Sequence, residues 1–416
     1  MIIRAFHSRL NRAFLVGCVL VGAIATKAEA GYTFTFVADS TGPFSDFGVV
    51  PSPALNALGT VAFVARFEGS GAGVFTGNGG ALTTITTIAT PPFGNPFSPP
   101  SINDSGMVAV PAGDRILAGN GGPLVTIADT AGQFKNFVSG YSASINSGGT
   151  VAFTASLDSG GGGYFASTGG IVTPLFLSSL SLGTSFSFAM NDAGTLGFRA
   201  TKPDNITGIV TLNGGSVTTI VDSTGPFNYF GSAPSLNGVG RVAFAAGVNG
   251  RDGGVFGIYS GNGGALTTIA DLAGPFSYLG DFDTYLPSIN ASGMVAFSAG
   301  LDAGGGGVFI GNGTITSEVI QAGDPLFGST VLGAGVFPRS LNDAGQVAFY
   351  YELANGTTGI AIANPIPEPG SAALLFGGLL AIFSSRRRRA LRCGAVRRSL
   401  SPRKTRRGGQ PRYAFL

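Results

Sequence analysis

One eight-residue motif recurs seven times along this chain and constrains its fold more than any other feature. The motif reads Asn-x-x-Gly-x-Val-Ala-Phe with mild variants, and successive copies begin 43 to 53 residues apart. A period of this size indicates a repeat architecture, in which each unit buries its apolar faces against its neighbours. The seven copies begin at Asn56, Asn103, Asn146, Asn191, Asn237, Asn290 and Asn342.

Each repeat contains the signals of four short strands. The Asn with Gly three positions later predicts a tight turn whose Gly takes a positive φ, and Val-Ala-Phe follows as a strand. A second strand comes next, and then an Asn-Gly pair that is typical of a two-residue hairpin. After the third strand and a Gly-Pro-Phe turn, an extended run returns to the next motif. The Asn-Gly pairs begin at Asn78, Asn120, Asn213, Asn262 and Asn312.

Four antiparallel strands per ~45 residues is the period of a propeller blade. We therefore predict an all-β, seven-bladed β-propeller-like domain over residues 31–364, with a β-solenoid as the alternative. The last repeat ends at Asn364 without its third strand, whereas Tyr32–Ala38 has the pattern of that strand. We expect residues 32–38 to pair with residues 359–363 and close the ring.

Both ends of the chain carry targeting signals. Residues 1–30 contain arginines, an apolar run and the small-x-small sequence from Ala28 to Ala30, which predicts a signal peptide that signal peptidase cleaves before Gly31. Near the other end, Pro367, Glu368 and Pro369 precede an apolar helix predicted at 371–385, which is short for a membrane span. Arginines follow this helix and place its end at the cytoplasmic face. They are Arg386, Arg387, Arg388 and Arg389.

Residues 365–389 resemble the PEP-CTERM sorting signal of Gram-negative bacteria. The resemblance implies transient insertion in the inner membrane and cleavage by an exosortase near Pro367-Glu368-Pro369. The repeats resemble bacterial surface proteins with tandem Asn-x-x-Gly-x-x-Ala-Phe motifs, which implies the outer envelope or the exopolysaccharide matrix. Such sorting signals usually stop soon after the arginines, whereas here a basic tail follows at 390–416. We expect this tail to contact anionic headgroups on the cytoplasmic side.

The composition of the body excludes several classes of function. Residues 31–364 hold 8 basic and 19 acidic residues, hence a net charge of −11, which disfavours nucleic acid as a partner. The single His and both Cys are His7, Cys18 and Cys393, outside this body. We therefore predict no thiol or imidazole catalysis, no metal site built on His or Cys, and no cofactor.

Carboxylates remain as candidate site residues. Four of them occupy equivalent positions before the Gly-Pro-Phe or Gly-Gln-Phe turns, where we expect them to form the turns. A ligand site should instead break the repeat symmetry, as Asp281, Asp283 and Tyr285 do in the longest spacing. The two carboxylates could serve glycoside chemistry or sugar binding, and a solvated loop is the alternative. The four turn carboxylates are Asp39, Asp129, Asp222 and Asp271.

Two Gly-rich connectors, Asp158–Gly162 and Asp302–Gly306, each supply a single carboxylate. We expect hairpin turns there and no calcium loop, since calcium requires several oxygen ligands close together. Together these observations predict an exported, non-enzymatic structural or interaction protein of the cell surface or its matrix, with extracellular polysaccharide as a possible partner. The alternative is a carbohydrate-active hydrolase or lyase that uses carboxylates at the propeller mouth.

Overall fold

The computed structural model describes residues 31–47, 52–88, 98–137, 140, 142–178, 187–202, 205–248, 255–280 and 285–367. These residues form 33 strands joined by turns. No helix among them is long and apolar enough to cross a membrane. The predicted signal peptide, the helix at 371–385 and the basic tail lie outside the described residues.

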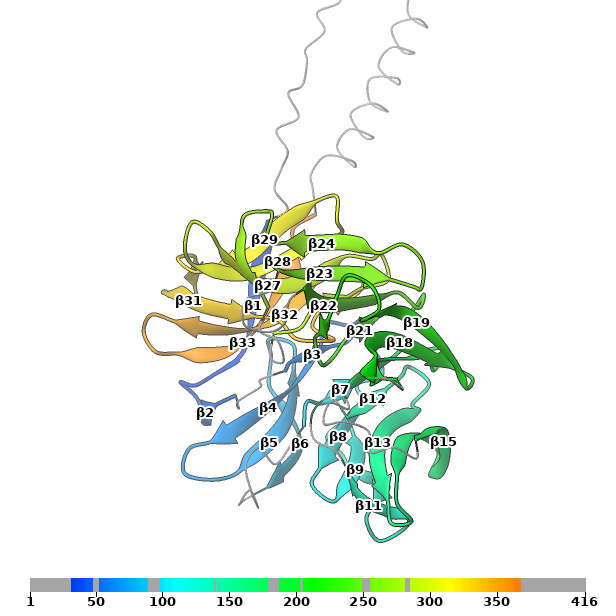
Figure 1. The fold of residues 1–416 in the computed structure, drawn as a ribbon. Coiled ribbons are helices and arrows are strands. Elements are labelled where there is room, and N and C mark those ends of the chain that lie inside the picture. Colours follow the sequence, from blue (N-terminus) through cyan, green and yellow to red (C-terminus); the bar gives the residue numbers. More distant parts are fainter. Residues whose placement is uncertain are drawn as a thin grey trace, which may run out of the picture. The chain divides into compact units, whose positions relative to one another are not determined.

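The strands form seven antiparallel sheets, one for each sequence repeat (Figure 1). Blade 1 contains β2 (Phe44–Asp46), β3 (Ala54–Leu55), β4 (Val61–Phe67), β5 (Ala72–Gly77) and β6 (Thr83–Ile88). Blade 2 contains β7 (Ser101–Ile102), β8 (Val108–Ala112), β9 (Arg115–Gly119) and β10 (Val125–Asp129). Blade 3 contains β11 (Phe134–Phe137), β12 (Ala143–Ile145), β13 (Val151–Leu157), β14 (Gly162–Thr168) and β15 (Ile171–Ser178).

Blades 4 to 7 repeat this order. Blade 4 contains β16 (Phe188–Met190), β17 (Leu196–Thr201), β18 (Thr207–Asn213) and β19 (Ser216–Asp222). Blade 5 contains β20 (Tyr229–Phe230), β21 (Ser235–Leu236), β22 (Val242–Val248), β23 (Val255–Gly261) and β24 (Thr267–Asp271). Blade 6 contains β25 (Phe276–Leu279), β26 (Ser288–Ile289), β27 (Val295–Leu301), β28 (Gly306–Gly311) and β29 (Thr316–Gln321). Blade 7 contains β30 (Pro325–Leu326), β31 (Ser329–Gly335), β32 (Val347–Leu353), β33 (Thr358–Pro365) and β1 (Tyr32–Asp39).

The N-terminal strand completes the last blade, as the sequence predicts. β1 pairs antiparallel with β33, from Tyr32 opposite Pro365 to Asp39 opposite Gly359, and the two strands lie side by side in Figure 1. Beyond the pair, the N–H of Ile366 donates to the carbonyl of Gly31 at 2.8 Å. First and last repeats therefore share one sheet, and a seven-bladed propeller replaces the β-solenoid alternative.

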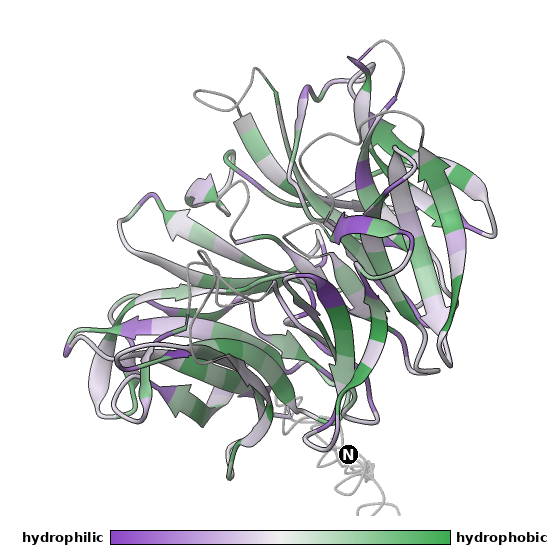
Figure 2. Ribbon diagram, turned by 90° about the horizontal axis from the view of Figure 1, so that it is seen from below, coloured by the Kyte–Doolittle hydropathy of each residue, from purple (hydrophilic) through white to green (hydrophobic). Residues whose placement is uncertain are grey.

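The Val-Ala-Phe strands form the core because neighbouring blades cover them on both faces. Val61, Ala62 and Phe63 have no exposed surface, and Figure 2 shows apolar residues along the middle of the blades. The Phe of the Gly-Pro-Phe turn joins this core: the ring of Phe44 lies 6.4 Å from that of Phe63 and 5.0 Å from that of Phe75, both edge-to-face. Such pairs add about 0.5–1.5 kcal/mol to the burial of their area.

The glycines of the motif occupy the conformation that the sequence predicts, whereas most Asn-Gly hairpins do not. Gly59, the fourth residue of the first motif, has a φ of 76°, and its equivalents lie between 75° and 83°. The chain turns within two residues at Asn213, which pairs with Ser216, and at Asn312, whose N–H donates to the carbonyl of Ile315 at 3.1 Å. Between the paired Thr76 and Thr83, six residues intervene. The prediction was wrong there because Leu82 folds back over Gly77, where a Cβ would lie 2.6 Å from the leucine Cδ2.

Candidate functional site at the propeller axis

The seven motif asparagines form a closed ring of hydrogen bonds around the axis. Each side-chain Nδ2 donates to a main-chain carbonyl of the next repeat, and six of the seven acceptors belong to the next motif Asn. The last bond runs from Asn342 back to the carbonyl of Asn56 at 3.0 Å, so the ring closes without a break. The other six bonds measure 3.0 to 3.5 Å, the longest being from Asn146 to the carbonyl of Asp192.

The same side chains also form the turns. In the first repeat, Asn56 Oδ1 accepts the N–H of Thr60 at 2.8 Å, and in the fifth repeat Asn237 Oδ1 accepts the N–H of Arg241 at 2.8 Å. The amide therefore accepts within its own turn and donates to the next blade. Only an amide of this length offers both, since a carboxylate has no donor. The sequence predicted the turn but not the ring.

A layer of serines supports the ring one step deeper. Ser288 Oγ accepts the N–H of Leu341 in the next blade at 3.0 Å, and equivalent bonds link Ser101 to Ile145, Ser144 to Met190 and Ser235 to Ile289. These serines stand two positions before the motif Asn. Sequence reasoning missed them, although the pattern Ser-x-Asn recurs and could have indicated them. Its members are Ser101, Ser144, Ser235, Ser288 and Ser340.

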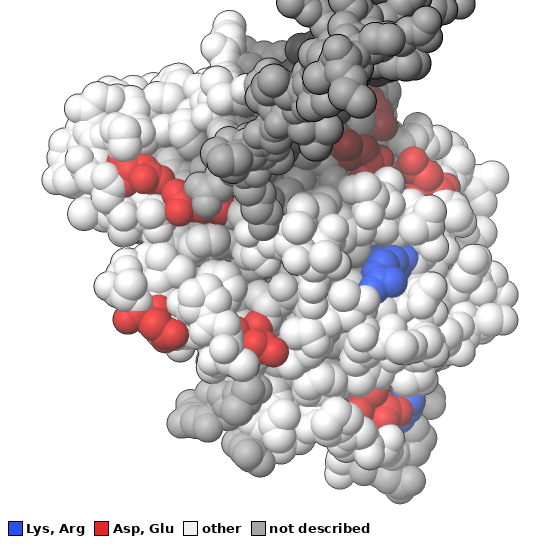
Figure 3. Space-filling model, turned by 90° about the horizontal axis from the view of Figure 1, so that it is seen from above, with Lys and Arg blue, Asp and Glu red and all other residues white. Residues whose placement is uncertain are grey.

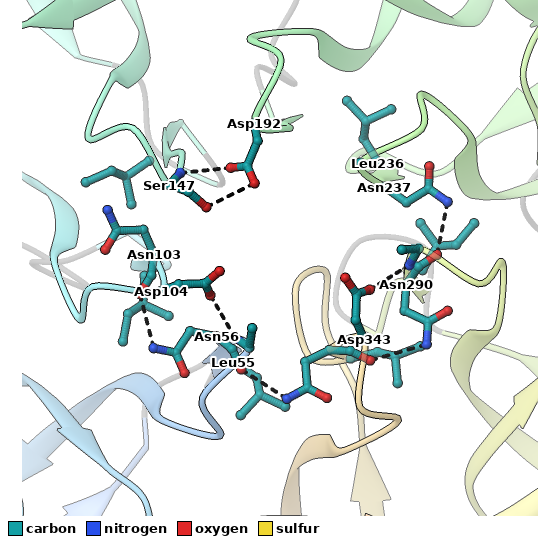
Figure 4. Close-up of a pocket in the computed structure, with 18 residues that line it drawn as sticks. Leu55, Asn56, Asn103, Asp104, Ser147, Asp192, Leu236, Asn237, Asn290 and Asp343 are labelled. Carbon is teal, nitrogen blue, oxygen red and sulfur yellow. Dashed lines mark hydrogen bonds between the residues drawn. The ribbon is translucent and has the colours of Figure 1, made fainter. Parts of the chain in front are cut away.

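A pocket of about 200 Å³ opens above these layers (Figure 4). The buried residues just before the motif Asn, such as Leu55, Ile102 and Ile289, lie at its floor. The exposed residues just after the Asn form its mouth. These mouth residues are Ala57, Asp104, Ser147, Asp192, Gly238, Ala291 and Asp343. The pocket therefore has an aliphatic floor, a ring of amides and a polar mouth.

The three mouth carboxylates bind backbone N–H groups of the preceding repeat. Asp104 Oδ1 accepts the N–H of Ala57 at 2.8 Å, and Asp343 Oδ1 accepts that of Ala291 at 2.7 Å. Asp192 accepts hydrogen bonds from both the N–H and the hydroxyl group of Ser147, at 2.8 and 3.0 Å. The N–H groups after the motif Asn in repeats 1, 3 and 6 are capped in this way. The other four repeats carry Ala57, Ser147, Gly238 and Ala291 in place of the aspartate, so the mouth is not symmetric.

The structure does not test the predicted paired carboxylates, because Asp281 and Asp283 lie outside the described residues. Tyr285 is described, half-buried between blades 6 and 7. Its ring lies 5.3 Å from that of Phe337 and covers the backbone at Gly335. Tyr285 therefore has a packing role between two blades, and it does not line the axial pocket.

The four repeated turn carboxylates serve their own turns, as predicted. Asp39 Oδ1 accepts the N–H of Thr41 at 2.9 Å, and Asp129, Asp222 and Asp271 make the equivalent bond. Asp222 also binds the ammonium of Lys202 at 2.7 Å. This hydrogen bond, with those from Thr224, lowers the pKa of Asp222 to about 2.

The structure also bears on the Gly-rich connectors and on parts of the targeting signals. The connectors that begin at Asp158 and Asp302 are hairpin turns between β13 and β14 and between β27 and β28. Among the described residues, no group of His, Cys, Asp and Glu could hold a metal ion. Gly31 and Pro367 are described, whereas Ala28, Ala30, Glu368, Pro369 and the arginines 386–389 are not. Figure 3 shows acidic side chains distributed over one face, with no basic patch among the residues drawn in white, red and blue.

Several solved structures are similar to this chain in fold. Polysaccharide lyase Uly1 matches at 13% identity over 77% of this chain and 91% of its own, with a TM-score of 0.47. YCF48 bound to D1 peptide matches at 13% identity over 81% and 99%, with a TM-score of 0.42. SapL1 lectin in complex with alpha methyl fucoside matches at 14% identity over 74% and 89%, with a TM-score of 0.36.

No curated protein matches the sequence of this chain. A family model, described as a family of unknown function (DUF7453), matches residues 36–313 and 330–373. These ranges cover most of the seven blades and begin within the closing strand β1. The chain therefore belongs to the DUF7453 family.

Proposed function

We propose that this protein is an exported, non-enzymatic interaction or structural component of the Gram-negative cell surface or its exopolysaccharide matrix. Export rests on the predicted signal peptide, and surface sorting rests on the PEP-CTERM-like residues 365–389. The propeller supplies a rigid body for this role. Its ends meet, since Gly31 and Ile366 are hydrogen-bonded to each other, so both predicted signals would attach at blade 7.

The observation that carries a binding role is the fixed arrangement of polar groups at the axis. The ring amides and the mouth carboxylates are held in place by bonds to neighbouring blades before any ligand arrives. Groups that are already ordered lose little conformational entropy on binding, which favours recognition. A site of this kind can orient a ligand without moving.

The alternative is a carbohydrate-active hydrolase or lyase. What favours it is that three carboxylates, those of Asp104, Asp192 and Asp343, stand at the mouth of one pocket. However, each has at least one oxygen engaged by a backbone N–H of the preceding repeat, which favours a positioned acceptor over a group that exchanges protons.

One experiment on the purified body, residues 31–367, compares binding with turnover. The protein is incubated with a panel of bacterial and commercial polysaccharides while retention on the polymer and release of reducing or unsaturated ends are both measured. We expect retention without release. Catalytic turnover that Asp104→Asn, Asp192→Asn or Asp343→Asn abolishes would establish the alternative. Detection of the native protein in the cytoplasm only would contradict the surface role.

A further inference from the structure

Gly238 lies in the one part of the mouth where two adjacent repeats lack an aspartate after the motif Asn. In repeats 2, 4 and 7 an aspartate at this position caps the N–H of the previous repeat. The other four repeats have Ala57, Ser147, Gly238 and Ala291 there, and repeats 5 and 6 are the only two adjacent ones without the aspartate. Among the described residues, the main-chain N–H groups of Asp104, Asp192, Gly238 and Asp343 consequently find no carboxylate, and those of Asp192 and Gly238 are the two that lie in adjacent repeats. In Figure 4 the mouth carries carboxylates at Asp104, Asp192 and Asp343 and none beside Asn237.

This departure leaves space as well as donors. A Cβ at Gly238 would meet no atom within 4 Å, and the residue is exposed at the mouth. Two main-chain donors of adjacent repeats thus lie beside this opening. The neighbouring carboxylate of Asp192 and the amides below add acceptors at the same place. A ligand with hydroxyl groups, each of which both donates and accepts, matches this mixture.

The size and chemistry of the pocket narrow the class of ligand further. Its volume of about 200 Å³ corresponds to about seven waters at ~30 Å³ each, which suits one sugar ring. The accessible lining is mainly polar, with a small aliphatic part at the floor, so the hydroxyl groups of such a ring would make most of its contacts. No Lys or Arg lines the pocket, and three aspartates do, so an anionic sugar is repelled.

We propose that the axial pocket binds one residue of a neutral glycan, with its hydroxyl groups at the Asp192 and Gly238 main-chain donors. This rests on the proposed function and adds the class of sugar and the position in the ring. A neutral hexose unit is favoured, and uronate or sulfated units are disfavoured. The aspartate-free side of the mouth is the entrance.

The test restores the missing carboxylate. Gly238→Asp would place an aspartate where three other repeats have one, so that it caps the N–H of Asp192 and fills the opening. Because the position has room for a side chain and three of its six equivalents are aspartates, we expect the variant to melt at or above the wild-type temperature. Ala291→Asp, which would cap the N–H of Gly238, is the second variant. Val239→Asp is the matched control, since Val239 is 75% exposed and does not line the pocket.

Binding is measured by calorimetry and saturation-transfer NMR with glucose, galactose and mannose oligomers and with oligogalacturonates. We expect at least one neutral series to bind, oligogalacturonates to bind at least tenfold more weakly, and Gly238→Asp to weaken binding more than tenfold while Val239→Asp stays within twofold. Neutral binding that both pocket variants leave unchanged overturns the site but leaves the proposed function. Preference for oligogalacturonates overturns the sugar class. If no glycan of a wide panel binds the wild type, the matrix-binding function fails as well.

Discussion

Replacing Asn237 by Asp separates the two roles of a ring asparagine. The variant keeps an oxygen that can accept the N–H of Arg241, at present 2.8 Å away. It loses the donor that reaches the carbonyl of Asn290 at 3.0 Å and places a carboxylate oxygen against that carbonyl. The substitution changes one nitrogen to oxygen, so packing is nearly unchanged and the effect is electrostatic.

The expected cost follows from the burial of the site. Asn237 is only 4% exposed, and losing one buried hydrogen bond costs about 1 kcal/mol. The carbonyl of Asn290 keeps a second donor, the N–H of Gly293, so it is not left unsatisfied. Burying a carboxylate beside it adds at least ~1 kcal/mol more. We expect a loss of about 2–3 kcal/mol at pH 7, or a fall in Tm of about 3–4 °C for a domain of this size.

The pKa of the new carboxylate determines how the stability loss of Asn237→Asp changes with pH. A buried carboxylate that faces a carbonyl has its pKa raised in the folded state above the unfolded value of about 3.9. The protonated acid can donate to Asn290, so the variant approaches wild-type stability below pH ~4. The deficit grows as the pH rises to the folded-state pKa and is constant above it.

Chemical denaturation at pH 4 and pH 7 measures this difference. The matched control is Asn312→Asp, because Asn312 is exposed, its Oδ1 accepts the N–H groups of Thr314 and Ile315, and its nitrogen donates to none of the described residues. The control should lose little stability at either pH. If Asn237→Asp matches the control at pH 7, the ring does not stabilise the propeller as we argue.

Three further perturbations test other contacts. Lys202→Met should raise the pKa of Asp222 from about 2 toward its ordinary value, as followed by carboxyl NMR, and an unmoved pKa would contradict the assigned cause. Because the folded-state pKa of Asp222 is low, the pair stabilises the fold above pH ~4, and this contribution disappears as the pH falls toward 2. Gly121→Ala should cost about 1–3 kcal/mol in denaturation experiments, since Gly121 has a φ of 101° and lies against the Thr83 methyl of blade 1, whereas the neighbouring Gly122→Ala should be nearly neutral. Deletion of residues 31–44 removes β1 and should abolish the single cooperative unfolding transition or cause aggregation at the exposed β33 edge. A melting temperature within a degree or two of that of the intact body would refute the role of ring closure.

The sequence predicted what is local and what repeats. The count of blades, the positive φ of Gly59 and its equivalents, and the closing strand all follow from periodicity and turn chemistry. The ring of amides does not, because the acceptor of Asn56 lies 47 residues away in another blade and no local pattern specifies it. The hairpins at Asn78, Asn120 and Asn262 were mistaken for two-residue turns because the leucine that folds back lies beyond the Asn-Gly pair.

The candidate site could not be predicted for a related reason. Asp281 and Asp283 drew attention because they break the repeat in composition, yet a break matters for binding only where it meets a cavity. Gly238 is inconspicuous in the sequence, one glycine among 69. Its importance depends on three aspartates in equivalent positions of other repeats, and their partners are visible only once the blades are placed around the axis.

A ring built from repeats constrains where recognition can occur. Each repeated polar residue described above already bonds to its own turn or to the next blade, as Asn237, Ser288 and Asp222 do. Such a group has already used part of its hydrogen-bonding capacity for the fold. Polar groups with unused hydrogen bonds are then expected where a repeat lacks a polar residue that other repeats have. By this reasoning the position of Gly238 is informative because two adjacent repeats lack the mouth aspartate there, and we expect other members of the family to bind their ligands where adjacent repeats of their own lack it.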